Sequence, residues 1–164
     1  MSVREIRLFG DPILKSPTVE VADFGSVTSL VQDLLDTTSL SGRAGVAATQ
    51  IGVGLSAFAY NVEGELGYLI NPKLTALAGS VELMEEGCLS VPGLWHKTPR
   101  HTEATAVGYQ LDGSMIEITG SGLMAQALQH EIDHLAGLLY LDRLAKDERK
   151  LAFKALREQP WFTR

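Results

Sequence analysis

The chain has 164 residues, a single cysteine and a formal net charge of −6 at pH 7. This length suits one folded domain, expected over residues 1–164, which can bury a core without covalent cross-links. One cysteine excludes an internal disulfide framework, and scattered Lys and Arg argue against a nucleic-acid-binding surface. Neither a secretory leader nor an apolar run of about 18 residues occurs. We therefore expect a cytoplasmic protein with no membrane partner.

The first 40 residues divide into an extended segment and a helix. Two prolines and the turn sequence Gly10-Asp11-Pro12 predict that residues 1–22 wrap the surface without forming a helix. Apolar residues then recur with helical spacing, which predicts a helix with one buried stripe, and Ser26 could cap its first turn. The stripe consists of Val27, Leu30, Val31, Leu34 and Leu35.

A stretch of small residues from 42 to 54 follows this helix. Glycine and alanine at such density allow backbone or a ligand to approach closely. Gln50 is the one side-chain amide in the stretch, and a buried glutamine must be hydrogen-bonded. Its side chain is therefore either a structural bridge, which the stretch alone favours, or a donor directed at a substrate.

The middle of the chain has the composition of β-strands. We expect strands over residues 55–62 and 67–70, the second ended by Asn71-Pro72, and another over residues 79–84. Imperfect alternation from 105 to 119 predicts a hairpin that turns at Asp112-Gly113.

Two histidines on one predicted helix indicate metal chemistry. The helix is expected over residues 123–136 with Gly137 at its end, and a last helix over residues 146–158. His130 and His134 are four residues apart, so their imidazoles lie one turn apart on the same face. Glu131 is close enough to reach a water on a shared metal ion. This is the His-Glu-x-x-His pattern of metal-dependent hydrolases.

A catalytic metal also needs a third protein ligand and an open position. One large protease group places a downstream histidine where this chain has Tyr140. Glu148 and Glu158 could supply a carboxylate, although solvated surface is the better interpretation of both. Cys88 lies upstream in a glycine-flanked segment. A lone cysteine is more often a small buried apolar residue, but without a downstream ligand the chain favours a ligand role for Cys88.

Three motifs in order strongly resemble the peptide deformylase family. They are Gly45-Val46-Ala47-Ala48-Thr49-Gln50, Glu86-Gly87-Cys88-Leu89-Ser90 and Gln129-His130-Glu131-Ile132-Asp133-His134-Leu135. The resemblance implies a hydrolase that removes the formyl group from the initiator methionine of new polypeptides and releases formate. It also implies an α+β fold, with antiparallel sheets packed around a central metal-binding helix and a C-terminal helix.

The resemblance assigns roles to residues of these motifs. By position, the metal ligands would be Cys88, His130 and His134, and Glu131 would be the general acid/base. Gln50 and the backbone N–H of Leu89 would hold the developing oxyanion. The substrate-binding positions are Ala44, Gly45, Met84, Gly87, Leu123 and Ala127, of which Met84, Leu123 and Ala127 could equally pack in the core.

The metal and the partners follow from the resemblance too. Thiolate and imidazole ligands accept both zinc and Fe(II), so spacing leaves the ion open. The family implies Fe2+, with Zn2+, Ni2+ or Co2+ as possible substitutes. The expected partners are N-formylmethionyl peptides and, by analogy alone, the ribosome through the last helix.

Arg43 departs from the family pattern, which commonly has a glycine at this position. Its charge could touch the substrate backbone or point into solvent, so substrate preference is in question more than activity. Trp95, His96 and Gln126 lie near the expected substrate pocket, and their effect on preference is open.

Two other classes compete with a deformylase. The first is a zinc endopeptidase of the general His-Glu-x-x-His kind, against which Tyr140 and the cysteine motif weigh. The second is a non-enzymatic module with a structural metal, in which Glu131 and Gln50 would have no evident task.

Overall fold

A single antiparallel sheet frames the part of the chain that the computed structural model describes, residues 2–162. The strand order in this part is β1-β2-β3-β4-β5. The strands are β1 (Gly45–Ala47), β2 (Ala57–Val62), β3 (Glu65–Cys88), β4 (Val91–Tyr109) and β5 (Met115–Ser121). The expected domain over residues 1–164 also covers Met1, Thr163 and Arg164, which lie outside the described residues.

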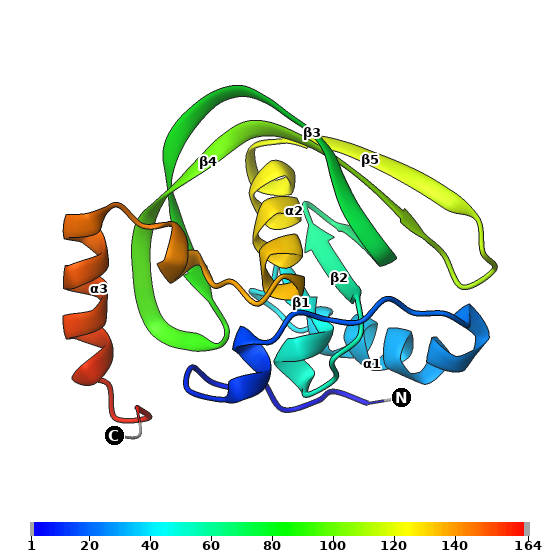
Figure 1. The fold of residues 1–164 in the computed structure, drawn as a ribbon, viewed down its shortest axis with the longest axis horizontal. Helices are drawn as coiled ribbons and strands as arrows, with labels where there is room; N and C mark the ends of the chain where they lie inside the picture. Colours follow the sequence, from blue (N-terminus) through cyan, green and yellow to red (C-terminus); the bar gives the residue numbers. More distant parts are fainter. Residues whose placement is uncertain (1, 163–164) are drawn as a thin grey trace.

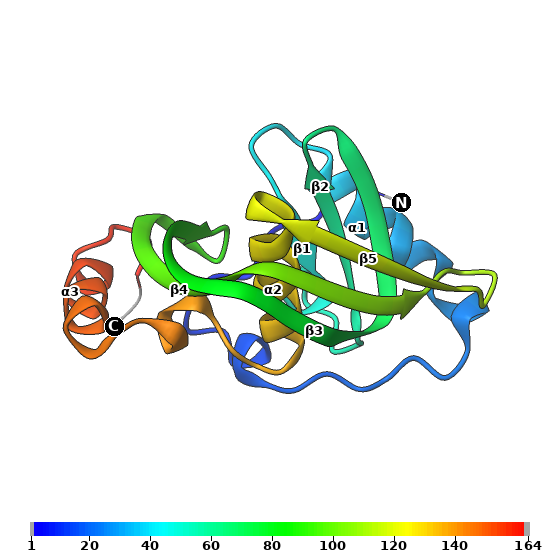
Figure 2. The same cartoon turned by 90° about the horizontal axis from the view of Figure 1, so that it is seen from above.

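Three α-helices are arranged around this sheet. They are α1 (Thr28–Thr38), α2 (Gly122–Leu135) and α3 (Lys146–Arg157). Figure 1 shows α2 in the hollow of the curved sheet, under the arch of β3 and β4, while α3 stands outside β4. Seen from above, α1 and α3 lie at opposite ends of the molecule (Figure 2). The expected mixed fold, with an antiparallel sheet around a central helix and a C-terminal helix, is confirmed.

Short 3-10 helices connect these elements within residues 2–162. They are η1 (Pro12–Lys15), η2 (Phe24–Val27), η3 (Ala48–Ile51) and η4 (Tyr140–Arg143). Among the described helices, none has both the length and the hydrophobicity that a membrane crossing requires.

The two longest strands differ from the sequence prediction. Residues 67–70 and 79–84, expected as separate strands, belong to the single strand β3. Asn71-Pro72 does not end it, because Asn71 adopts a φ of 49° and the pairing with β4 shifts register between Ile70 and Lys73. Such a bulge accommodates a proline that has no N–H to donate. The strand β4 begins well before the predicted hairpin, whose turn at Asp112-Gly113 is confirmed.

Helix α1 buries the predicted stripe, but it begins differently from the prediction. Val31 and Leu34 are 2% and 0% exposed. The chain enters α1 through η2, where the side chain of Asp23 accepts a hydrogen bond from the Gly25 N–H. The hydroxyl of Ser26 donates to the carbonyl of Asp23, so the expected Ser26 cap is wrong. Asp23 caps η2, and the N-cap position of α1 is Val27, which makes no side-chain capping hydrogen bond.

Helix α2 packs directly on the sheet. Ala125 and Leu128 are fully buried in a cluster that also contains Phe58 of β2 and Leu69 of β3. Gly137 follows the helix with a φ of 81° and donates its N–H to the carbonyl of His134, as expected for a helix-ending glycine. This packing fixes the helix that carries both histidines relative to the strands around it.

The N-terminal segment runs without a strand or α-helix over residues 2–22, apart from η1, as predicted. Its backbone bonds to all three sequence motifs. The N–H groups of Arg7, Phe9 and Thr18 donate to the carbonyls of Gln50 (2.7 Å), Ser90 (2.8 Å) and Leu135 (2.9 Å), respectively. The segment therefore ties together the three stretches of chain that form the site.

Candidate active site

Three potential metal ligands from two elements converge at one point. Cys88 ends β3, and His130 and His134 project from α2. Cys88 Sγ lies 3.4 Å from His134 Nε2, which lies 3.2 Å from His130 Nε2. The ligand atoms lie within 4.8 Å of one another, and residues 2–162 contain no second group of this kind.

The donor set fits a divalent metal ion. The Nδ1 atom of His130 lies 2.6 Å from Glu86 Oε2, and a proton shared there leaves the lone pair of Nε2 for a metal. Two ring nitrogens and a sulfur then face one another, an arrangement that a cation stabilises. One cysteine and two histidines also leave the fourth position that a catalytic ion needs.

The protonation of the two histidines differs when no metal is bound. Burial lowers the pKa of His134 well below its ordinary value, and the charge of His130 lowers it further. Burial also opposes protonation of His130, but hydrogen bonds with Cys88 and Glu86 raise its pKa well above the ordinary value. Without a metal ion, His130 therefore holds a proton more readily than His134, and a metal ion would compete with that proton.

A buried ion-pair network lies behind His130. The Glu86 carboxylate accepts hydrogen bonds from Arg100 Nε (2.9 Å) and Nη2 (2.7 Å). Arg100 Nη1 also donates to Asp133 (2.8 Å), which accepts two further bonds from Arg143. Burial alone would raise the pKa of Glu86, but hydrogen bonds from Arg100 and His130 lower it to about 2. The network keeps Glu86 ionised and holds the imidazole of His130 in place.

Sequence reasoning missed this network. Glu86 and Asp133 stand inside the recognised motifs, two residues before Cys88 and one before His134. Arg100 has no motif around it, so no sequence signal indicated that its side chain would be buried between two carboxylates.

Glu131 lies on the other side of His130, at the cleft. Its side chain is 3% exposed, and Oε1 lies 3.7 Å from His130 Nε2. Its Oε2 has no hydrogen-bond partner among the described residues. Burial raises the pKa of Glu131 to about 7, although the charge of His130 opposes this. A carboxyl group that exchanges its proton near neutrality suits general acid/base catalysis.

Gly45 makes room for this carboxylate. A Cβ at this position would lie 2.9 Å from Cγ, Cδ and Oε1 of Glu131. The glycine of the first motif is therefore required by the glutamate of the third.

Gln50 is held at both ends of its amide. Its Oε1 accepts from the N–H of Ala47 (3.0 Å), and its Nε2 donates to Ser90 Oγ (3.1 Å). The same Nε2 lies 3.6 Å from Cys88 Sγ. The side chain thus bridges η3 to the turn after β3 and also lines the cleft beside the sulfur.

A cleft of about 460 Å³ opens above the cluster, a size typical of small-ligand sites. Ten of the residues predicted for the site line it: Ala44, Gly45, Gln50, Gly87, Cys88, Leu89, Leu123, Ala127, His130 and Glu131. His134 is fully buried. Met84 is not among the lining residues and instead pairs with Thr98 in the β3–β4 ladder.

The sequence left open the effect of four residues on substrate preference, and the structure places three of them at the cleft. Arg43, Trp95 and Gln126 line the cleft. The imidazole of His96 instead pairs with Glu148 of α3 at 2.9 Å. The Arg43 guanidinium donates to the carbonyl of Thr37 at 3.0 Å, which holds it against the end of α1.

A His-Glu-x-x-His helix joined by an upstream cysteine, under a curved antiparallel sheet, defines a metal-dependent hydrolase. Comparison with known proteins narrows this class. A family model described as polypeptide deformylase matches residues 3–150. The chain belongs to the polypeptide deformylase family.

Individual relatives agree with this assignment. The peptide deformylase of Acidothermus cellulolyticus is 45% identical over 162 residues, which cover 98% of this chain and 89% of that protein. Peptide deformylase 1 of Corynebacterium glutamicum is 41% identical and covers 100% of both chains. The crystal structure of a peptide deformylase from Legionella pneumophila matches with a TM-score of 0.87 at 35% identity, covering 96% of this chain and 95% of that one.

Proposed function

We propose that this protein hydrolyses the N-formyl group from the initiator methionine of new polypeptides and releases formate. The observation that carries the proposal is the cluster of Cys88, His130 and His134 beside Glu131 in an open cleft. Membership of the polypeptide deformylase family supports it. We place the protein in the cytoplasm, where new polypeptides are available.

Cys88, His130 and His134 would hold the metal ion. Such an ion polarises a carbonyl group and makes a water molecule more acidic. We propose Fe2+ as the working ion and Zn2+, Ni2+ or Co2+ as substitutes, since thiolate and imidazole donors accept all of these.

Glu131 moves the protons of the reaction. Its carboxylate accepts a proton from the water whose oxygen attacks the formyl carbon. It then donates this proton to the amine nitrogen as the C–N bond breaks, and formate and the free amine leave. Its position at the cleft, with no hydrogen-bond partner for Oε2 among the described residues, leaves this carboxyl group able to exchange a proton with the substrate.

Gln50 and Leu89 stabilise the negative charge that grows on the formyl oxygen. The donors are Gln50 Nε2 and the backbone N–H of Leu89, which flank Cys88 at the cleft wall. Losing one donor of this type costs about 2.7–4 kcal/mol in other enzymes. We expect a similar loss for Gln50→Ala.

The cleft walls suit a formylated methionine. Ala44, Gly45 and Gly87 bring backbone close to the substrate chain, while Leu123 and Ala127 offer apolar surface to the methionine side chain. Gly45 lies so close to Glu131 that an added Cβ would be 2.9 Å from three atoms of its side chain. We expect this part of the cleft to accept a formyl group and to exclude the methyl group of an acetyl substrate.

Formate release from formyl-Met-Ala-Ser tests the proposal, with protein prepared without oxygen. We expect release that a chelator abolishes, and none from the acetyl peptide. Cleavage of internal peptide bonds would instead show an endopeptidase, and metal-loaded, folded protein without hydrolysis would show a structural site. Equal activity after aerobic and anaerobic handling would count against Fe2+.

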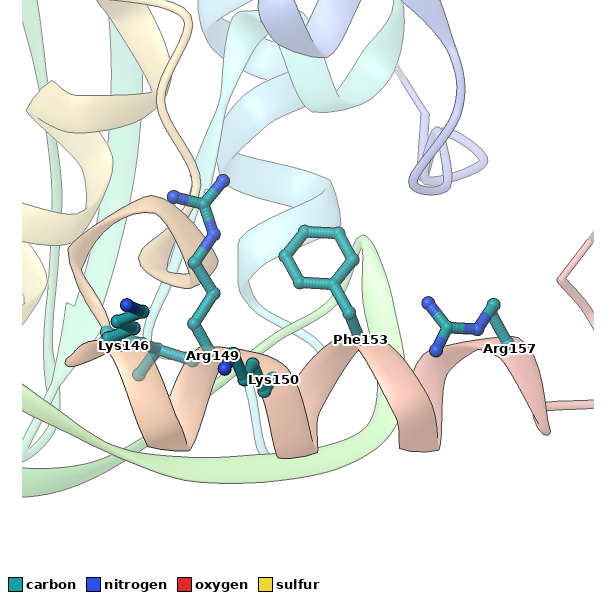
Figure 3. A pocket seen from close by; sticks show the side chains of 6 residues that line it. Lys146, Arg149, Lys150, Phe153 and Arg157 are labelled. Atoms are coloured by element: carbon teal, nitrogen blue, oxygen red, sulfur yellow. The ribbon is translucent and has the colours of Figure 1, made fainter.

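We further propose that α3 contacts the ribosome. The sequence predicted scattered cations and no nucleic-acid-binding surface, but Lys146, Arg149, Lys150 and Arg157 line a shallow hollow of about 570 Å³ on α3 together with Phe153. Figure 3 shows Arg149 and Phe153 projecting from the same side of the helix, and their side chains make a cation–π contact. Grouped cations of this kind suit the phosphates of ribosomal RNA.

Co-sedimentation with ribosomes tests this contact. The double variant Lys146→Glu, Lys150→Glu should lose binding, and added salt should weaken the wild type. Lys73→Glu changes an exposed lysine on β3 and serves as the control. Equal binding of both variants would refute the contact.

A further inference from the structure

Trp95 is an exposed aromatic residue at the rim of the cleft. Its side chain is 65% exposed, whereas Leu94 is 8% exposed and His96 is half-buried. All three belong to β4, in which successive side chains point to opposite faces. The buried Leu94 and the half-buried His96 fix the backbone, and the alternation of the strand directs Trp95 outward. Its exposure is thus set by the strand.

The indole ring lies against the backbone of Gly87. A Cβ on Gly87 would be 2.6 Å from Cε3 of Trp95, closer than any side chain tolerates. Gly87 is not among the glycines with a positive φ, so its conformation does not require glycine. The missing side chain serves the close approach of the ring. Because Cys88 is the next residue, this ring lies beside a proposed metal ligand.

The second tryptophan provides a contrast. Trp161 donates its indole N–H to the carbonyl of Pro92 at 3.0 Å and packs on the apolar cluster beneath α3. Within residues 2–162, the indole N–H of Trp95 donates to no acceptor. Both the ring face and the N–H of Trp95 can therefore serve a ligand in the cleft.

We propose that Trp95 is a specificity-determining residue that binds the side chain of a substrate residue just downstream of the formyl-methionine and favours apolar and aromatic side chains there. The inference rests on the proposed function, because a polypeptide substrate continues beyond its first residue and must leave the cleft across the rim. An extended peptide directs successive side chains to opposite sides. The second or the third residue therefore faces the ring.

Turnover of two peptide series tests the preference. The series are formyl-Met-X-Ser and formyl-Met-Ala-X, with X as Ala, Leu or Phe. In one series we expect the wild type to favour Phe over Ala in kcat/KM, and Trp95→Ala to reduce this ratio about fivefold. Trp95→Phe should restore most of it. Leu151→Ala removes a similarly exposed apolar side chain from α3 and should leave the ratio unchanged.

A change of all peptides by the same factor in Trp95→Ala would overturn the proposal, as would an unchanged ratio in both series. Either result would leave Trp95 a structural cover for Gly87.

A binding measurement separates this proposal from the proposed function. The chain has two tryptophans, so Trp161→Phe leaves Trp95 as the only indole, and Glu131→Gln slows turnover enough for a binding titration. Titration of this double variant with formyl-Met-Ala-Phe and its alanine counterpart should change the fluorescence, with half-saturation at a lower concentration for the phenylalanine peptide. Formate release by the wild type decides the function. Equal half-saturation or no change would overturn the role of Trp95, whatever the activity.

Discussion

Two buried glutamates on either side of His130 are tuned in opposite directions. Glu86 and Glu131 are both 3% exposed, yet the pKa of Glu86 falls to about 2 and that of Glu131 rises to about 7. Both carboxyl groups are almost inaccessible to solvent, and their hydrogen-bond donors differ. Arg100 and His130 hydrogen-bond to Glu86, whereas one oxygen of Glu131 has no partner within residues 2–162. Glu86, on the rear side of His130, stays ionised, whereas Glu131, on the front side at the cleft, can exchange a proton.

Removing the front carboxylate should have the largest effect. We expect Glu131→Gln to lower kcat/KM for formate release about 100- to 10,000-fold, because proton transfer loses its carrier. The amide has nearly the same shape and removes a costly buried charge, so thermal unfolding should not occur at a lower temperature. Full activity in the folded variant would contradict a catalytic role and favour a structural metal site.

Removing the rear carboxylate should damage the fold more than the chemistry. Glu86→Gln leaves the buried charge of Arg100 without one of its partners, and breaking such a pair costs about 3–5 kcal/mol. Loss of the bond to His130 should also weaken metal binding about 10- to 100-fold. Denaturant unfolding and chelator competition measure the two effects.

Glu148→Gln is the matched control for this variant. Glu148 also pairs with a histidine, His96, but its side chain is 35% exposed, so its loss should cost less than about 1 kcal/mol. Equal destabilisation by the two substitutions would show that the network behind His130 contributes no more to the free energy of unfolding than an exposed pair does.

The two carboxyl groups should give the metal-free protein opposite pH dependences. Both have an ordinary pKa of 4.5. Glu86, lowered to about 2, stabilises the fold above about pH 4.5, and this is lost as the pH falls toward 2. Glu131, raised to about 7, favours the fold below about pH 4.5, and this is lost as the pH rises through 7.

Each contribution amounts to about 3 kcal/mol. Unfolding of chelated wild type and Glu131→Gln across pH 4–8 measures the second one. The wild type should lose stability relative to the variant as the pH rises. Parallel curves would refute the raised pKa of Glu131.

The smallest expected effect comes from a substitution that crowds the Glu131 side chain. Gly45→Ala places a methyl group 2.9 Å from three atoms of Glu131, which should cost about 1–3 kcal/mol of stability. Displacing the carboxylate should also lower kcat/KM about tenfold. Gly54→Ala is the control, because nothing lies within 4 Å of its added Cβ. Equal behaviour of the two variants would show that Gly45 is not needed for the position of Glu131.

Much of the fold follows from local patterns in the sequence. The spacing of apolar residues predicted α1, and the glycine after Ala136 predicted the end of α2. The Asp112-Gly113 turn predicted the β4–β5 hairpin. Each depends on residues a few positions apart, so the sequence carries the information directly. The lack of a downstream third ligand favoured Cys88 as a metal ligand, and the family resemblance supported this, because spacing alone cannot specify a contact between positions 88 and 130.

The remaining features depend on distant contacts. Asn71-Pro72 looks like the end of a strand, and only the pairing of β3 with β4 carries the chain through it. Arg100 contacts Glu86 and Asp133, which are 14 and 33 residues away in the sequence. A charged residue on a strand ordinarily predicts a side chain that faces solvent, so the burial of Arg100 was not predictable. Met84 had two equal interpretations from the sequence, pocket or core packing, and it is not among the residues that line the cleft.

The contacts of the N-terminal segment determine when the site can form during synthesis. Residues 7, 9 and 18 leave the ribosome before any of their partners at positions 50, 90 and 135, and domains fold as their parts become available during synthesis. The N-terminal segment is synthesised first, but it is among the last parts of the chain to form its native contacts. The cleft is complete only when almost the whole chain has emerged, so a half-made copy has no working centre with which to act on its neighbours.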